Sequence, residues 1–325
     1  MKRPVYILLF LLISNLAVSQ QLPVYSQYLA NKFLINPAVA GSDGYTTLTL
    51  AAREQWVGYY GAPNTFSFAG QGRILKKGIS FRRYGSGKKA YRPKSDGRVG
   101  VGGYIFSDKN GIVQRTGFQI AYSYHLWLQR STQLSLGLAF TGYNFKIDQS
   151  QINFENPNDP WLNNNLRSGI FVPDAMFGAY ILNPKYSLGF SVDELFEGAA
   201  KFGDYAYKNY ELDRHYYLFG TYYIELNNYM NLQPSFLFVM SEELLPMADI
   251  GMNYFYNNKF WVGLAYRTSE AIIAHAGVRY QNITFGYSFD FTLSEIQRVT
   301  YGTHELTIAL KFGDSARKYR WLDRY

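Results

Sequence analysis

The side chains that could do chemistry are few in this sequence, and their spacing forms no catalytic set. Cysteine is absent, which excludes thiol nucleophiles, Cys-ligated zinc, iron–sulfur clusters and disulfide scaffolds. The four histidines, His125, His215, His275 and His304, leave little material for a histidine metal cage. A serine hydrolase is the enzyme alternative, but no G-x-S-x-G motif occurs and no serine is locally paired with a histidine and an acid. We therefore expect no enzyme activity, no cofactor and no bound metal.

Positive charge is concentrated in residues 73–98, where ten basic residues accompany one acid, Asp96, in a chain whose formal net charge is +8. The glycines of this segment favour a flexible, solvated loop. Its charge favours electrostatic docking to an acidic periplasmic partner or to membrane phosphates, and both interpretations stay open. Interleaved aromatic residues are typical of a nucleic-acid-binding arm, but the export signal described below removes nucleic acid as an expected partner. The candidate partner-binding residues here are Lys76, Lys77, Arg82, Arg83, Lys88, Lys89, Arg92 and Lys94.

Residues 156–161 (NPNDPW) supply one more candidate contact, Trp161. Asn, Pro and Asp favour a turn, and Asp159 alone cannot hold calcium, which takes six or more oxygen ligands. Trp161 is then either an exposed turn residue or an anchor for bound cargo, because Trp is enriched at binding hot spots.

Residues 1–19 have the pattern of a secretory signal peptide. After a positively charged start, Val5–Ile13 form an unbroken apolar run, and Ala17-Val18-Ser19 place small residues before the expected cleavage point. The apolar run is too short for a membrane-spanning helix, which needs about 20 residues. We expect the mature chain to begin near Gln20, outside the inner membrane.

From Tyr45 onward, apolar and polar residues alternate with the two-residue period of β-strands. In residues 132–148, for example, Leu134, Leu136 and Leu138 lie on one face and small or polar residues lie on the other. Most segments between turn residues reach the roughly 9–11 residues of a tilted membrane strand. They predict fourteen strands at 45–53, 64–74, 98–107, 113–128, 132–148, 171–182, 185–192, 214–226, 230–241, 246–256, 259–268, 271–280, 282–292 and 303–312.

A soluble β-sandwich also alternates, so two further features decide between the architectures. The apolar face of nearly every strand is large and aromatic, while the opposite face carries Gly, Ser, Thr, Ala and Gln. Lys and Glu are also scarce within the predicted strands. Both features favour a closed antiparallel transmembrane β-barrel over residues 45–312, with bulky side chains toward lipid and small polar ones toward the lumen. Inside it, Asp249 and Asp290 are expected to pair with Arg267 or Arg279.

The connections fit a bacterial barrel whose N-terminus is periplasmic. Long connections, at 54–63, 149–170, 193–213 and 293–302, then fall outside, and very short ones, such as 183–184 and 257–258, fall in the periplasm. Residues 75–97 break this pattern, since they are long and yet periplasmic.

Two segments flank the predicted barrel. Residues 20–44 form a short segment before the first strand, either a small plug or gate in the periplasmic mouth or a brace for that strand. We favour the brace, because short segments before a strand usually pack against that strand. Residues 313–325 form a charged C-terminal tail.

Residues 23–41 read PVYSQYLANKFLINPAVAG, and Arg53, Gln55 and Trp56 precede the run Gly61-Ala62-Pro63-Asn64-Thr65. With residues 99–111, 154–165, 173–178 and 257–263, these segments resemble the PorP/SprF family of Bacteroidetes outer-membrane proteins. The resemblance spans essentially the whole mature chain. The basic insertion 75–97 and the tail 313–325 depart from the usual family pattern, which leaves the paralogue and its partner open.

The resemblance implies an accessory barrel of the type IX secretion system, in the outer membrane. Such barrels serve export or surface attachment of adhesins and other cargo with a C-terminal secretion domain, often alongside gliding motility. The expected partners are other secretion components of the periplasm or outer membrane, the cargo and the lipid bilayer. The family has no established catalytic residues, so none is carried over. The alternative is a channel or transporter for a small solute, because fourteen strands can enclose either a packed lumen or a narrow path.

Overall fold

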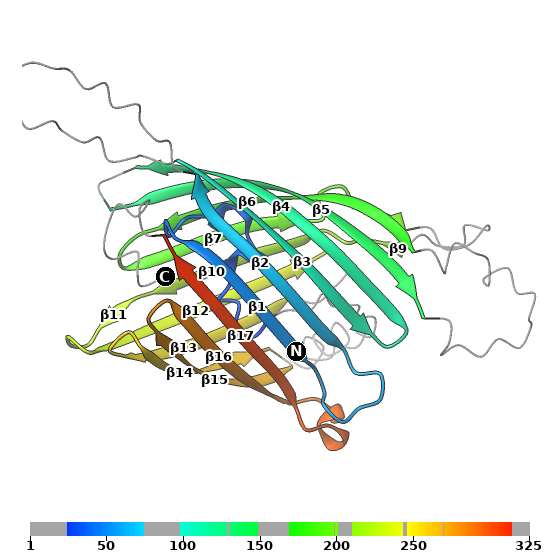
Figure 1. Ribbon diagram of the computed structural model, residues 1–325. Helices are drawn as coiled ribbons and strands as arrows, with labels where there is room; N and C mark the ends of the chain where they lie inside the picture. Colours follow the sequence, from blue (N-terminus) through cyan, green and yellow to red (C-terminus); the bar gives the residue numbers. More distant parts are fainter. Residues whose placement is uncertain are drawn as a thin grey trace, which may run out of the picture.

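The computed structural model describes residues 25–74, 98–128, 131–148, 169–197, 199–200, 210–242, 246–268 and 270–313. Within these residues the chain forms one closed antiparallel β-barrel with its N-terminal segment inside (Figure 1). None of the helices in this part of the chain has the length and apolar character to cross a membrane. The predicted fold class is confirmed.

The strands of the barrel wall run obliquely around it (Figure 1). They are β1 (Thr46–Glu54), β2 (Asn64–Ile74), β3 (Val99–Asn110), β4 (Val113–Trp127), β5 (Gln133–Ile147), β6 (Ile170–Leu182), β7 (Tyr186–Asp193), β10 (His215–Tyr222), β11 (Ile224–Glu225), β12 (Met230–Ser241), β13 (Met247–Tyr256), β14 (Phe260–Arg267), β15 (Ala271–Tyr280), β16 (Ile283–Thr292) and β17 (Thr303–Phe312). The two-residue strands β8 (Ala199–Ala200) and β9 (Tyr210–Glu211) form a separate pair.

The number of barrel strands agrees with the prediction once one interruption is recognised. The predicted strand 214–226 is divided into β10 and β11 at Tyr223, whose N–H donates to the carbonyl of Lys185 at 2.6 Å. Because β10 and β11 both pair with β12, they act as one strand of the wall, and the described barrel has fourteen.

The sheet closes where the first and last strands meet. β1 pairs antiparallel with β17 along its whole length, from Thr46 opposite Phe312 to Glu54 opposite His304. Neighbouring strands in the wall are neighbours in sequence everywhere else, so closure leaves no open sheet edge. A closed sheet can satisfy its backbone hydrogen bonds without water, which is what a membrane demands.

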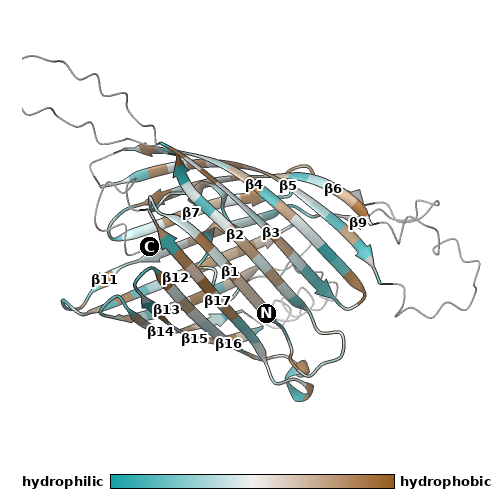
Figure 2. Ribbon diagram, viewed as in Figure 1, coloured by the Kyte–Doolittle hydropathy of each residue, from teal (hydrophilic) through white to brown (hydrophobic). Residues whose placement is uncertain are grey.

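The two faces of the wall differ in the way the alternation predicts. Large apolar side chains such as Ile120, Leu138 and Leu264 are exposed on the outside, whereas Gln119, Ser135 and Thr307 are buried on the inside. Figure 2 shows the resulting alternation of apolar and polar bands along the strands. An apolar outside around a polar inside is the arrangement of a transmembrane barrel.

The two ends of the barrel also differ. At the end called here the short-turn end, the connections include residues 183–185, 257–259 and 281–282. At the opposite, long-loop end, the connections include residues 55–63, 148–169, 194–214 and 293–302. Exposed tyrosines follow the rim of the short-turn end, at Tyr186, Tyr222, Tyr256 and Tyr280. Tyrosines in that position are typical of the boundary between membrane and water.

Replacement of Leu264 by Arg tests the lipid-facing side of the wall. Leu264 lies in the middle of β14 and is 64% exposed. We expect Leu264→Arg to lower the free energy of unfolding in phospholipid vesicles by about 2–4 kcal/mol, because the charge would face the centre of the bilayer. The control is Tyr60→Arg at a loop residue whose side chain is 86% exposed. It should change the free energy of unfolding by less than about 0.5 kcal/mol. Equal effects in a urea titration would contradict the assignment.

Candidate functional site

The lumen is filled by residues 25–44, called here the plug. The plug consists of turns and two short 3-10 helices, η1 (Lys32–Leu34) and η2 (Pro37–Val39), and nearly all of its side chains are buried. Asn36 begins η2 by accepting a hydrogen bond from the Ala38 N–H at 2.9 Å, and Pro37 follows at the first helical position, where its missing N–H is no loss. The plug contacts strands on opposite sides of the barrel, so it does more than brace β1.

The wall carries small residues where the plug comes closest. A Cβ atom on Gly137 of β5 would overlap the backbone of Ala38, and one on Gly178 of β6 would overlap the Asn36 side chain. Glycine is therefore required at both positions for this close approach. In sequence these glycines are ordinary members of the small inward face, so alternation alone does not reveal their role.

The Asn36 side chain joins the plug to two neighbouring strands. Its amide donates to the carbonyls of Ala179 in β6 and Phe190 in β7, both at 3.0 Å. The Ser191 hydroxyl of β7 donates to the carbonyl of Ile35. These bonds satisfy buried polar groups that would be costly to leave without a partner.

A buried ion cluster anchors the plug toward the long-loop end. Arg53 of β1 lies 2.9 Å from Asp290 of β16 and 3.1 Å from Glu305 of β17. The backbone N–H groups of Ser26 and Gln27 donate to the Glu305 carboxylate at 2.8 and 3.0 Å, and the Ser26 hydroxyl donates to Asp290 at 2.6 Å. One arginine and the start of the plug thus compensate two buried carboxylates. The Asp290 partner is Arg53, which the sequence prediction did not identify, whereas Asp249 pairs with Arg267 at 3.0 Å as expected.

A second anchor holds the plug at the short-turn end. The Arg73 Nε donates to the Gly41 carbonyl at 2.9 Å, and the Gln133 amide donates to the Ser42 carbonyl at 3.1 Å. His125 lies between the Ala40 carbonyl, 3.0 Å from its Nε2, and the Ser135 hydroxyl, 2.7 Å from its Nδ1. The plug is therefore fixed at both ends of the lumen.

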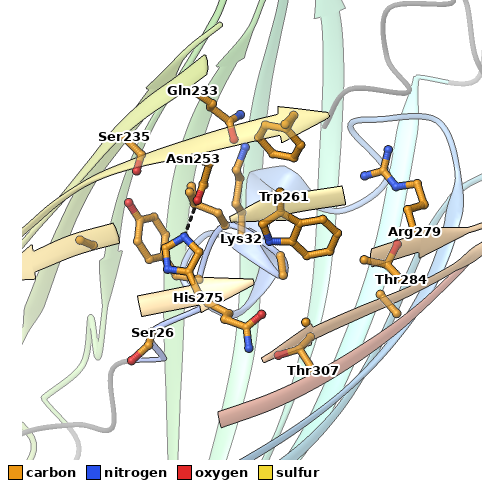
Figure 3. A pocket seen from close by; sticks show the side chains of 18 of the residues that line it. Ser26, Lys32, Gln233, Ser235, Asn253, Trp261, His275, Arg279, Thr284 and Thr307 are labelled. Carbon is orange, nitrogen blue, oxygen red and sulfur yellow. Dashed lines mark hydrogen bonds between the residues drawn. The ribbon is translucent and has the colours of Figure 1, made fainter. Parts of the chain in front are cut away.

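A cavity of about 100 Å³ remains between the plug and the wall formed by β12 to β17. Figure 3 shows Lys32, Trp261 and His275 around it, with His275 hydrogen-bonded to Asn253. Burial, with a smaller contribution from the nearby Lys311 cation, lowers the pKa of Lys32 to about 7. The lining combines hydrogen-bonding groups with two charged residues that are already paired, Asp249 with Arg267 and Lys311 with Asp43, each at 3.0 Å.

The described histidines do not combine into a catalytic set. His125 contacts Ser123 and Ser135, His215 contacts Glu194 at 2.6 Å, His275 contacts Asn253, and His304 contacts Tyr287 at 2.7 Å. No histidine in the described ranges joins a serine hydroxyl to a carboxylate. The same ranges hold no group of three or more His, Asp or Glu residues arranged for a metal ion.

The partner-binding residues predicted from sequence all lie outside the described residues. This applies to Lys76, Lys77, Arg82, Arg83, Lys88, Lys89, Arg92 and Lys94 and to Trp161. The predicted signal peptide 1–19 and most of the tail 313–325 lie outside them as well.

Comparison with known proteins places this barrel among secretion proteins. The profile of the family described as "Type IX secretion system membrane protein PorP/SprF" matches residues 17–310. No curated protein matches the chain.

Among solved structures, the chain is similar to the CymD monoaromatic hydrocarbon channel, at 11% identity over 90% of this chain and 93% of that one, with a TM-score of 0.48. It is also similar to the Pseudomonas putida toluene transporter TodX, at 10% identity over 86% and 92%, TM-score 0.45. A Pseudomonas aeruginosa FadL homologue matches at 11% identity over 82% and 88%, TM-score 0.42.

Removing the arginine of the buried ion cluster tests the plug anchor. We expect Arg53→Met to lower the free energy of unfolding by about 3–5 kcal/mol, because it leaves the Asp290 and Glu305 carboxylates buried without their cation. The control is Arg214→Met, which removes an arginine at the rim that pairs with Glu197 at 2.7 Å. Because solvent screens this pair, the variant should lose much less free energy of unfolding. Equal losses for the two variants in urea unfolding would show that the cluster is no anchor.

Proposed function

The chain belongs to the PorP/SprF family of type IX secretion system membrane proteins, and from this membership we propose that it is an accessory barrel of the outer membrane. It supports the secretion or surface attachment of cargo through protein–protein contacts. The cargo consists of adhesins and gliding-related proteins that carry a C-terminal secretion domain. The family match over residues 17–310 is the observation that carries the proposal.

The filled lumen supports contact with proteins over solute transport. The plug is tied to the wall at both ends, and the cavity beside it, about 100 Å³, is below the roughly 300 Å³ of the smaller ligand pockets in proteins. A partner would then be recognised at the ends of the barrel and not along its axis.

The short-turn end faces the periplasm in this proposal, and residues 1–19 are a cleaved signal peptide. Short periplasmic turns and long outer loops are the pattern of bacterial barrels, which supports this orientation. The basic segment between β2 and β3 then meets a periplasmic partner, with Lys88, Lys89 and Arg92 among its contacts. In the same proposal Trp161, in the connection between β5 and β6, contacts cargo outside the cell.

Copurification tests the partner role. Epitope-tagged protein from the native envelope should bring down type IX components or cargo, and the triple variant Lys88→Glu, Lys89→Glu, Arg92→Glu should recover less partner with unchanged barrel assembly. The matched control Lys185→Glu, Lys259→Glu reverses exposed charges of the short-turn end outside the basic segment and should recover as much as wild type. If the tagged wild type recovers neither secretion component nor cargo, the proposed function is wrong. If the triple variant recovers as much partner as wild type does, the basic segment is a solvated loop without a binding role.

Conductance in planar bilayers separates this role from the channel alternative. We expect the wild-type protein to show no steady ion current, because the plug occupies the lumen. Deletion of residues 26–40 should produce a steady current while circular dichroism still reports a β-barrel. A steady open pore in the wild type would instead favour a transporter for a small solute.

A further inference from the structure

A second cavity, of about 60 Å³, lies on the side of the plug away from the first one. Leu34 and Ile35 of the plug form one wall, and β2, β3, β4, β5, β7 and β10 supply the rest. Its polar lining comes from residues close to the strand ends at the long-loop end, such as Arg115 in β4 and Asp193 in β7. The cavity therefore lies toward the outer mouth in the proposed orientation.

Arg115 is held in this cavity by aromatic rings. Its Cζ lies 5.3 Å from the ring centroid of Phe106 and 5.3 Å from that of Tyr143. Gly117 leaves the space for Phe106, because a Cβ there would overlap the phenyl ring. A guanidinium placed between two ring faces gains cation–π stabilisation and a fixed orientation.

The guanidinium has no hydrogen-bond acceptor among the described residues, although it carries five N–H donors. Two other lumen arginines have acidic partners, since Arg53 pairs with Asp290 at 2.9 Å and Arg267 with Asp249 at 3.0 Å. Donors enclosed by protein need an acceptor, so water or a ligand must supply the one that the wall does not. The guanidinium of Arg115 therefore has unused N–H donors that could bind the oxygens of an anion.

Three tyrosine hydroxyls add to this binding capacity. Tyr104, Tyr143 and Tyr217 line the same cavity, and their hydroxyls likewise have no hydrogen-bond partner within the described part of the chain. Each hydroxyl can donate to an oxygen of a ligand or accept from an N–H. The cavity therefore offers several hydrogen-bonding groups that the fold itself leaves unused.

The charges around the cavity restrict the ligand further. Asp193 faces the cavity, and one of its oxygens accepts from the Glu194 N–H at 2.9 Å. Glu194 and Asp108 also act electrostatically on Arg115, but Glu194 is paired with His215 at 2.6 Å. An anion alone would be repelled by Asp193, whereas a ligand with a carboxylate and a neighbouring donor would satisfy both Arg115 and Asp193.

We propose that this cavity binds a carboxylate carried beside a hydrogen-bond donor, as found in an amino acid or in an acidic residue of a peptide. The carboxylate pairs with the Arg115 fork and accepts from the tyrosine hydroxyls, and the donor bonds to Asp193. One water position takes about 10–15 Å³, so 60 Å³ holds a group of a few heavy atoms rather than a larger molecule. This site goes beyond the secretion role and does not depend on it.

Titration calorimetry on the purified, detergent-solubilised full chain tests the site. The probes are free L-aspartate, a six-residue peptide blocked at both ends with one Asp, and the same peptide with Asn in place of Asp. We expect aspartate or the Asp peptide to bind, and the Asn peptide to bind at least about tenfold more weakly, because it lacks the charge that Arg115 recognises. Binding of aspartate alone assigns the site to small molecules, and binding of the Asp peptide assigns it to polypeptides.

Variants of Arg115 complete the test. Arg115→Met should lose at least about tenfold in affinity, and Arg115→Lys should fall between it and wild type, because lysine keeps the charge without the bidentate fork. Arg298→Met, at an exposed position of the 3-10 helix η5 (Glu295–Val299), should bind as wild type does. Arg115→Met loses the cation–π contacts with Phe106 and Tyr143 and should melt somewhat lower, but circular dichroism should report the same folded β-barrel as for wild type. No heat from any probe at millimolar concentration, or equal binding by Arg115→Met, would overturn the proposal.

Discussion

The pairing of β1 with β17 is the interaction on which the rest of the structure depends. Without it, two long strands would present unpaired N–H and C=O groups to lipid, where no water can replace the missing partners. Once the ends join, the inward side chains are enclosed in a space that the wall alone does not fill. The small residues of that inner face, such as Gly137 and Gly178, leave room that the plug occupies. Closing the sheet satisfies its backbone groups in lipid, but it also creates a lumen, and the plug fills that lumen.

The wall was predictable from the sequence because its determinants are local. Alternation with a period of two identified every long strand, and β2 begins and ends where predicted, at Asn64 and Ile74. The division of the predicted strand 214–226 was not visible, because it depends on a hydrogen bond from Tyr223 to Lys185, a residue of another connection. The two-residue alternation shows which face of the sheet each side chain lies on. It does not show which residue accepts the hydrogen bond of each backbone N–H.

The interior was far less predictable, because its contacts join residues that are distant in sequence. Ser26 and Glu305 are 279 residues apart, and nothing near either residue indicates the other. Arg53 stands out in sequence only as part of a family signature, yet it compensates Asp290 and Glu305 at once. Arg115 is inconspicuous in sequence, since an arginine two residues into a strand is ordinary, and only the rings of Phe106 and Tyr143 distinguish it.

The position of the plug at the start of the chain has a consequence for the order of assembly. Its partners at the long-loop end lie on β16 and β17, the last strands to be synthesised. At the short-turn end its partners lie on earlier strands, Arg73 on β2 and Gln133 on β5. The bonds from Ser26 to Asp290 and Glu305 therefore cannot form before the last two strands exist, and contacts of such long range form slowly.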